Sequence, residues 1–200
     1  MEVISVKHKA DIIKGEYQFA DKVKREVLSL LNKPVVVAIP QDDSNVKASL
    51  HTVWNWEPEN ITFRNLKEYI REEIEKHYKP GAMSGGGRNL LKCGNFWANV
   101  YEKGDYAQSH NHKPNHYSFA YFVKAKWYDS PFILTDSGKK VRPKEGRFCL
   151  FPAYMHHAVP KHRYKHQRIT LSGNIDMDEV KENPIERLNW FSPNGREDLK

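Results

Sequence analysis

Histidines gather in the second half of this chain in a pattern suited to binding a metal ion. The 200-residue sequence has ten histidines, and seven of them lie between His110 and His166. Neutral imidazole is the commonest metal ligand near pH 7. His110 and His112 are two residues apart, so on an extended strand both side chains would project from the same face. A third histidine, His157, could complete a three-point face that leaves coordination positions open, as a catalytic metal requires.

An alternating segment follows these histidines. Arg168, Thr170 and Ser172 would share one face of a strand, and Ile169 and Leu171 would share the other. In one interpretation the strand is buried on its apolar side only, and the polar side chains face water. In the other interpretation the polar face lines a cavity, where the planar guanidinium of Arg168 would bind a carboxylate.

Length and composition favour a single cytoplasmic domain spanning residues 1–200. The two cysteines, Cys93 and Cys149, occur in apolar contexts, which predicts buried free thiols rather than a disulfide framework. No apolar run approaches the roughly 20 residues that a membrane span requires. The first residues also lack the long apolar region of a signal peptide.

The net charge of +7 comes from 32 basic and 25 acidic residues that are spread along the chain. Without a dense basic block, this charge indicates solubility and general anion attraction, and we expect no nucleic-acid partner. Residues 110–112 spell the letters of a nuclease motif, but that motif disperses its residues over a larger unit, so the string is a coincidence.

The first ninety residues mix helical and strand patterns. Helical spacing of apolar residues predicts helices over residues 11–31 and 63–78. Short β-branched or alternating runs predict strands at residues 34–40 and 51–56. A glycine-rich loop at 84–88 lacks the Gly-Lys-Ser/Thr of a phosphate-binding loop, so we interpret it as a linker.

From residue 94 onward the pattern is that of a β protein. Turn residues separate the expected strands, which span residues 95–101, 117–128, 131–135, 147–151 and 167–175. Several short strands with regular turns predict a sandwich or jelly roll. We therefore divide the chain into helices and supporting strands (1–90), a metal-binding core (91–176) and a C-terminal tail (177–200).

Four motifs occur in order along this core. They are Tyr101-x-x-Gly104-x-Tyr106, His110-x-His112, Phe151-Pro152-x-x-x-x-His157 and Arg168-x-Thr170-x-Ser172. Their order and spacing resemble the Fe(II)- and 2-oxoglutarate-dependent dioxygenases. The closest resemblance is to the prolyl-4-hydroxylase-like group, which includes small oxygenases of phage and bacteria. It covers about residues 94–176.

The resemblance implies a mainly β fold, a double-stranded β-helix (jelly roll) with N-terminal helices packed on its outside. It implies that His110 and His157 bind the metal and that Arg168 binds the distal carboxylate of 2-oxoglutarate. Thr170 and Tyr121 are plausible further contacts to that carboxylate. It implies no catalytic residue beyond the metal site.

One position departs from the family pattern, because His112 stands where the family has a carboxylate. Three neutral imidazoles would leave Fe(II) with two net positive charges instead of one, and the dianion 2-oxoglutarate would offset this. We favour His110, His112 and His157 as the ligands. The alternative is a site of His110 and His157 alone, or one completed by a carboxylate such as Asp105 or Asp129.

The remaining histidines have weaker claims to the metal. His156 competes with His157, but adjacent strand residues face opposite ways, and the spacing from Phe151-Pro152 favours His157. The others are interpreted as surface or loop histidines (His116, His162 and His166).

The implied activity is hydroxylation of a C–H bond, with Fe(II) as cofactor and with dioxygen and 2-oxoglutarate as co-substrates. 2-Oxoglutarate would become succinate and carbon dioxide. A peptidyl proline is one candidate substrate, and another peptide or a small molecule is also open. Two alternatives remain. One is a non-catalytic jelly-roll module that binds a sugar or a protein. The other is a cupin-type dioxygenase with three histidines that uses no 2-oxoglutarate.

Overall fold

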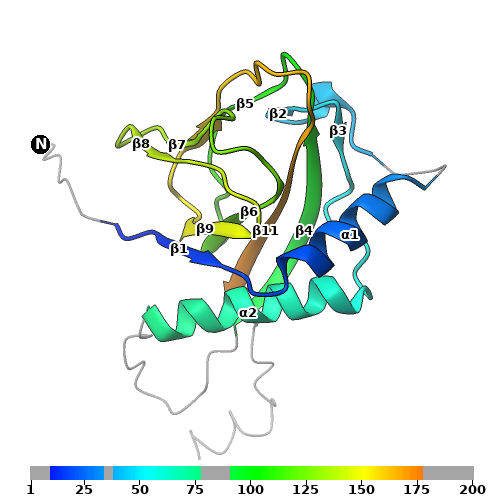
Figure 1. The fold of residues 1–200 in the computed structure, drawn as a ribbon. Coiled ribbons are helices and arrows are strands. Elements are labelled where there is room, and N and C mark those ends of the chain that lie inside the picture. The colour runs from blue at the N-terminus through cyan, green and yellow to red at the C-terminus, as the bar shows by residue number, and fades with distance from the viewer. Residues whose placement is uncertain (1–9, 34–37, 78–90, 178–200) are drawn as a thin grey trace, which may run out of the picture.

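Two antiparallel β-sheets face each other in this protein, and two helices cover the outer side of one of them (Figure 1). The computed structural model describes residues 10–33, 38–77 and 91–177. The strand expected at 34–40 lies mostly outside the described residues. The glycine-rich loop at 84–88 and all but the first residue of the C-terminal tail also lie outside them.

The larger sheet has six strands and the smaller has five. In spatial order the larger sheet consists of β1 (Ile13–Glu16), β9 (Arg147–Pro152), β6 (Tyr117–Lys124), β11 (Arg168–Met177), β4 (Leu91–Tyr101) and β3 (Leu50–His51). The smaller consists of β2 (Val46–Lys47), β5 (Tyr106–His110), β10 (His157–Val159), β7 (Phe132–Leu134) and β8 (Lys139–Val141). The predicted mainly β jelly roll with helices on its outside is confirmed.

The helices pack on the larger sheet through an apolar stripe. Phe63, Leu66, Ile70 and Ile74 of α2 (Ile61–His77) recur at helical spacing, and all are buried. Burying each of these side chains contributes about 1.5–3 kcal/mol. The side-chain oxygen of Asn60 accepts hydrogen bonds from the first turn of the helix and caps it. Helix α1 (Ala20–Leu31) adds its own buried residues to this core.

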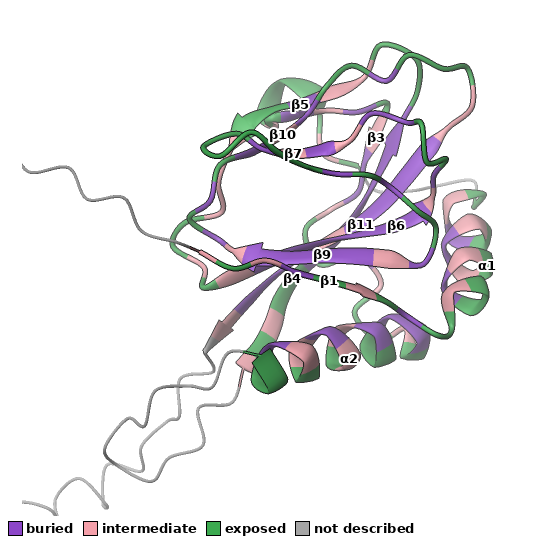
Figure 2. Cartoon of the chain, turned by 60° about the vertical axis from the view of Figure 1, so that its left-hand side comes forward, coloured by how far each residue is buried: buried purple, intermediate pink, exposed green. Residues whose placement is uncertain are grey.

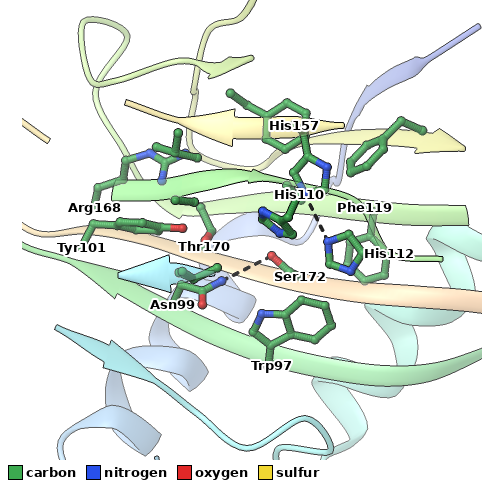
Figure 3. A pocket seen from close by; sticks show the side chains of 16 residues that line it. Trp97, Asn99, Tyr101, His110, His112, Phe119, His157, Arg168, Thr170 and Ser172 are labelled. Carbon is green, nitrogen blue, oxygen red and sulfur yellow. Dashed lines mark hydrogen bonds between the residues drawn. The ribbon is translucent and has the colours of Figure 1, made fainter. Parts of the chain in front are cut away.

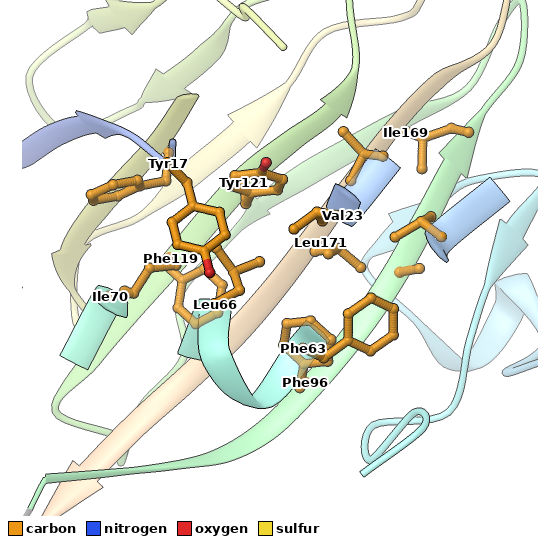
Figure 4. Close-up of a cluster of buried hydrophobic side chains, with 14 of the residues drawn as sticks. Tyr17, Val23, Phe63, Leu66, Ile70, Phe96, Phe119, Tyr121, Ile169 and Leu171 are labelled. Carbon is orange, nitrogen blue, oxygen red and sulfur yellow. The ribbon is translucent and has the colours of Figure 1, made fainter. Parts of the chain in front are cut away.

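A second core fills the space between the two sheets, so the central strands are buried on both faces. Figure 2 shows that β6, β9 and β11 are buried along most of their length, whereas α1 and α2 each expose one side. On β11, Ile169 and Leu171 belong to the helix-side core drawn in Figure 4. Arg168 and Thr170 project the other way, toward the smaller sheet. The alternation seen in the sequence therefore separates two buried environments.

The helix expected over residues 11–31 is wrong in its first part. Ile13–Glu16 form strand β1, which pairs with β9 at the edge of the larger sheet, and α1 begins only at Ala20. Gly15 fits this position because a Cβ there would lie 2.4 Å from the ring of Phe148. Sheet pairing satisfies the backbone of this segment and buries Ile13, which outweighs its weak helical spacing.

Several expected strands are shorter in the structure. The strand at 117–128 ends at Lys124, and a turn follows. The strand at 51–56 is reduced to β3 and isolated bridges at Thr52 and Asn55. Strands β2, β5, β8 and β10 lie outside the predicted strand ranges. All of them except β5 have only two or three residues and so give little periodic signal.

Both cysteines are free, as predicted, but only Cys149 is fully buried, while Cys93 is half-buried. Burial raises the pKa of both thiols to about 12. Neither helix of the described chain is long and apolar enough to cross a membrane.

Candidate metal and cosubstrate site

His110, His112 and His157 meet between the two sheets, although 45 residues separate the last two in sequence. His110 ends β5 and lies opposite His157, the first residue of β10. Ligand nitrogens of the three side chains all lie within 4.8 Å of one another. The Nε2 atoms of His112 and His157 are 3.1 Å apart (Figure 3). Two ligands at right angles and about 2.1 Å from an ion would be about 3.0 Å apart, so this spacing fits a shared metal.

Backbone carbonyl groups orient two of the three rings. Nδ1 of His110 is 2.7 Å from the carbonyl oxygen of Gln108, and Nδ1 of His157 is 3.1 Å from that of Met155. Each Nδ1 therefore carries the proton and donates it, so Nε2 is the nitrogen whose lone pair can bind a metal. Metal-binding histidines are typically fixed by such contacts to their second nitrogen.

His112 reaches the cluster in a different way from the one predicted. Strand β5 ends at His110, so the two-residue strand spacing does not place His112. Instead, the backbone N–H of His112 donates to the carbonyl of Ala153 at 2.8 Å. The backbone carbonyl of His112 accepts a hydrogen bond from the side-chain amide of Asn115 at 2.6 Å. Its ring stacks on Trp97 with centroids 5.7 Å apart. A turn thus aims His112 at the other two rings.

Burial lowers the pKa of all three imidazoles, because it penalises their charged forms. The pKa of His112 falls to about 3, with His110 adding a smaller repulsion. The pKa of His157 falls well below its ordinary value, and both neighbouring histidines contribute after burial. The rings are therefore neutral near pH 7, which is the form that binds metal.

Arg168 is buried in the same cavity, so the interpretation in which its face meets water is wrong. The side chain is 1% exposed, and its Nε and Nη1 atoms have no hydrogen-bond partner among the described residues. Its guanidinium carbon lies 4.9 Å from the ring centre of Tyr101 and 5.5 Å from that of Phe122. Burial lowers the pKa of Arg168, and Tyr101 and Asp129 oppose that effect. A buried cation with unpaired donors suits an anionic ligand.

The cavity joins Arg168 to the three histidines. The volume that water-sized molecules can reach within it is about 40 Å³. Thr170 and Ser172 line it from β11, as predicted. In the described part of the chain, Trp97 Nε1 and Asn99 Oδ1 also lack hydrogen-bond partners, and both residues line the cavity. Several unpaired polar atoms in this cavity could therefore bind a polar ligand.

The sequence did not single out the cavity residues of β4. Trp97, Asn99 and Tyr101 lie opposite Ser172, Thr170 and Arg168 in the β4–β11 register. Tyr101 appeared only as part of a motif. The alternation of residues 97–101 was available as a signal, but which face lines the cavity depends on pairing with a strand about 70 residues away.

Tyr121, which was predicted to contact the cosubstrate, lies on the wrong face. It pairs with Leu171 on one side and Phe148 on the other, and it packs in the helix-side core with Tyr17 (Figure 4). Its hydroxyl is buried and has no hydrogen-bond partner within the described ranges, and burial raises its pKa. Tyr101 is the tyrosine beside Arg168.

The alternative carboxylates are engaged elsewhere. Asp105 Oδ2 accepts hydrogen bonds from Ser49 and from the backbone N–H of Glu102. Asp129 belongs to a separate cluster with His162 and His166.

His156 points away from the three-histidine cluster. Its Nε2 lies 3.0 Å from the amide of Asn111, and its Nδ1 lies 3.4 Å from Asp136. His116 contacts Asp176 and is exposed. The part of the chain that the structure describes therefore brings together the predicted histidines and Arg168, and no carboxylate joins the three-histidine cluster there.

The chain resembles known proteins in part of its sequence and in its fold. The model of the family described as "Putative 2OG-Fe(II) oxygenase" (2OG is 2-oxoglutarate) matches residues 133–174, which include His157, Arg168 and Thr170. A search of curated proteins found no match.

Solved structures share the fold at low sequence identity. The 2-oxoglutarate complex of a viral collagen prolyl hydroxylase from Paramecium bursaria Chlorella virus-1 aligns with a TM-score of 0.62 and 11% identity, covering 82% of this chain and 94% of that one. HygX from Streptomyces hygroscopicus, with nickel and 2-oxoglutarate bound, aligns with a TM-score of 0.62 and 8% identity, and the alignment covers 85% of this chain and 84% of HygX. A Trichoplax adhaerens prolyl hydroxylase was solved in complex with a peptide fragment of the hypoxia inducible factor oxygen degradation domain. It aligns with a TM-score of 0.58 and 14% identity, and the alignment covers 82% of this chain and 83% of that one.

These structural likenesses show the fold. Together with the family match, they support an Fe(II)- and 2-oxoglutarate-dependent oxygenase, and hence an oxidoreductase.

Proposed function

We propose that this chain hydroxylates a C–H bond with Fe(II) held by His110, His112 and His157 and with 2-oxoglutarate bound by Arg168. One observation carries the proposal. A buried arginine with two unpaired nitrogens shares a cavity with three neutral histidines whose nitrogens converge. A metal and a dicarboxylate would each satisfy one end of that cavity.

The donor set fits Fe(II), because imidazole suits divalent iron and three ligands leave room for other groups. It differs from the usual set of two histidines and one carboxylate in having no negative charge. The dianion 2-oxoglutarate would supply that charge. When bound, Fe(II) and 2-oxoglutarate together with dioxygen supply an oxidation that yields succinate and carbon dioxide and adds oxygen to the substrate.

The role of the protein's own residues would be to bind 2-oxoglutarate and to orient it. Arg168 would form paired hydrogen bonds to the distal carboxylate, with Tyr101 and Phe122 holding its guanidinium in place. The Thr170 hydroxyl lines the same part of the cavity and would be a further contact. Apolar walls from Phe119, Phe132 and Phe151 would exclude water from the reacting groups.

For the substrate we propose a proline-containing peptide. Trp54 is 43% exposed and packs edge-on against Trp97, with ring centres 4.7 Å apart, while Trp97 stacks on His112. Aromatic side chains thus continue from His112 to the surface. Grooves lined with aromatic rings bind extended proline-rich segments. The Trichoplax enzyme, which shares the fold, was solved with a peptide bound.

Anaerobic loading with Fe(II) and 2-oxoglutarate, followed by exposure to air, tests the function. We expect one iron per chain, and succinate formation that requires both iron and 2-oxoglutarate. A proline-rich peptide should gain the mass of one oxygen atom. A protein that binds no iron would support the binding-module alternative. Oxidation that proceeds equally without 2-oxoglutarate would support the cupin-type alternative.

A further inference from the structure

A second group of potential metal ligands lies outside the cavity, where two loops meet. Asp129 belongs to the turn after β6, and His162 and His166 belong to the loop between β10 and β11. One ligand atom from each of the three lies within 4.8 Å of the others. The group uses none of the residues assigned above to iron or 2-oxoglutarate.

The Asp129 carboxylate is held on one side and directed at a histidine on the other. Its side chain is 0% exposed. Its Oδ2 accepts the backbone N–H of Lys126 at 2.8 Å, and its Oδ1 lies 2.8 Å from Nε2 of His166. A carboxylate buried to this extent requires a positive or strongly donating partner.

His162 has a buried nitrogen that nothing in the described chain satisfies. The residue is 1% exposed, and its Nε2 lies 2.7 Å from the backbone oxygen of His166. Because a carbonyl oxygen only accepts, Nε2 carries the proton, and Nδ1 keeps its lone pair. That Nδ1 is buried and has no hydrogen-bond partner. A buried acceptor without a hydrogen bond destabilises the folded state, so this nitrogen is expected to bind a ligand.

We propose that Asp129, His162 and His166 bind a zinc ion, with water as the fourth ligand. Zinc takes nitrogen and carboxylate oxygen ligands at about 2.0–2.1 Å in a tetrahedron, so the ligand atoms would be about 3.3 Å apart. The contact between His166 and Asp129 is 2.8 Å, and all three ligand atoms lie within 4.8 Å of one another, so small movements of the side chains would reach that spacing. The neutral His166 ring would move its proton from Nε2 to Nδ1, while His162 would keep its Nε2–H bond to the backbone.

The surroundings shield this group on one side. The ring of Tyr164 stacks on His166 at 5.5 Å, and Tyr128 packs edge-on against Tyr164 at 4.8 Å. Three basic side chains of the loop would repel a cation, but all are exposed, so water and salt screen them (Lys161, Arg163 and Lys165). The buried guanidinium of Arg168 also interacts with Asp129, whose negative charge offsets its repulsion of a cation.

Zinc in this position would fasten one loop to the other. His166 precedes Arg168 by two residues, so the ion would fix the beginning of β11. We therefore assign it a structural role, separate from the oxidation chemistry of the cavity.

Zinc titration in a His110→Ala/His157→Ala background tests the proposal, because this background lacks two of the cavity ligands. After chelator treatment, we expect one zinc per chain and a higher melting temperature with zinc. Adding His166→Gln should abolish both effects. Adding His77→Gln, at an exposed histidine of α2, should leave both unchanged.

A folded background that binds no zinc would overturn the proposal, as would binding that survives both His166→Gln and Asp129→Asn. The cluster would then be a hydrogen-bonded pair beside a buried histidine. If the background does not fold, the parent should bind two divalent ions and His166→Gln one, and equal numbers would overturn the proposal. Iron-dependent succinate formation is measured separately in the parent, so its failure would not affect this result.

Discussion

The two histidine clusters differ in what surrounds their ligand atoms. The cavity cluster has three imidazoles and no carboxylate, and it opens toward the unpaired guanidinium of Arg168. The loop cluster contains its own carboxylate, Asp129, and lies against the rings of Tyr128 and Tyr164. Both sites would have three protein ligands and at least one position left for water. They differ in their neighbours, because among the described residues the cavity cluster shares its space with an unpaired guanidinium and the loop cluster does not. The first arrangement suits an ion that works with an anionic cosubstrate, and the second suits an ion that only holds loops together.

The largest expected difference in metal binding is between alanine variants of the neighbouring residues His156 and His157. His157→Ala should abolish metal binding in the cavity, because His157 is buried there with Nε2 directed at His112. His156→Ala should largely retain it, because that side chain contacts Asn111 and Asp136 instead. Manganese titration followed by electron paramagnetic resonance measures both. Equal loss in the two variants would contradict the assignment.

A smaller effect is expected at His112, the position that departs from the family pattern. His112→Asp should keep the metal by restoring a carboxylate ligand, and His112→Ala should bind it much more weakly. Titration of Fe(II) or Mn(II) into the parent and both variants provides the comparison. Parent-like affinity in His112→Ala would mean that two histidines hold the ion and that His112 is a bystander.

Arg168→Ala should weaken 2-oxoglutarate binding about 10- to 150-fold, the equivalent of roughly 1.5–3 kcal/mol for a charge-assisted contact. Metal affinity should change little. Tyr121→Phe is the matched control, because its hydroxyl lies in the helix-side core and should not affect 2-oxoglutarate affinity. Calorimetric titration of 2-oxoglutarate in the presence of Mn(II) measures both variants. An unchanged affinity in Arg168→Ala would show that the guanidinium does not bind the cosubstrate.

The sequence predicted the cavity histidines and Arg168 because their residue types and order are distinctive. It failed at Tyr121 for a physical reason. Strand β6 is almost entirely apolar and is buried on both faces, so no alternation indicates which side chains point into the cavity. Only its register against β11, with Tyr121 beside Leu171, settles that.

The loop cluster was missed for a related reason. His162 and His166 were interpreted as loop or surface histidines, and Asp129 was considered only for the cavity metal. The two loops meet because β10 and β11 lie in opposite sheets and the turn after β6 folds beside them. No local pattern encodes that contact.

The sequence by itself determined the periodicities that make strands and one long helix, and the set of residues able to bind a metal and a carboxylate. Tertiary structure decided which faces of those strands enclose the cavity, and it aimed His112 through a turn rather than along a strand. It also turned residues 13–16 from an expected helix into the strand beside β9. The physical reason is that side-chain period is a local property of the backbone. Strand register and loop contacts depend instead on hydrogen bonds and packing between segments far apart in the chain.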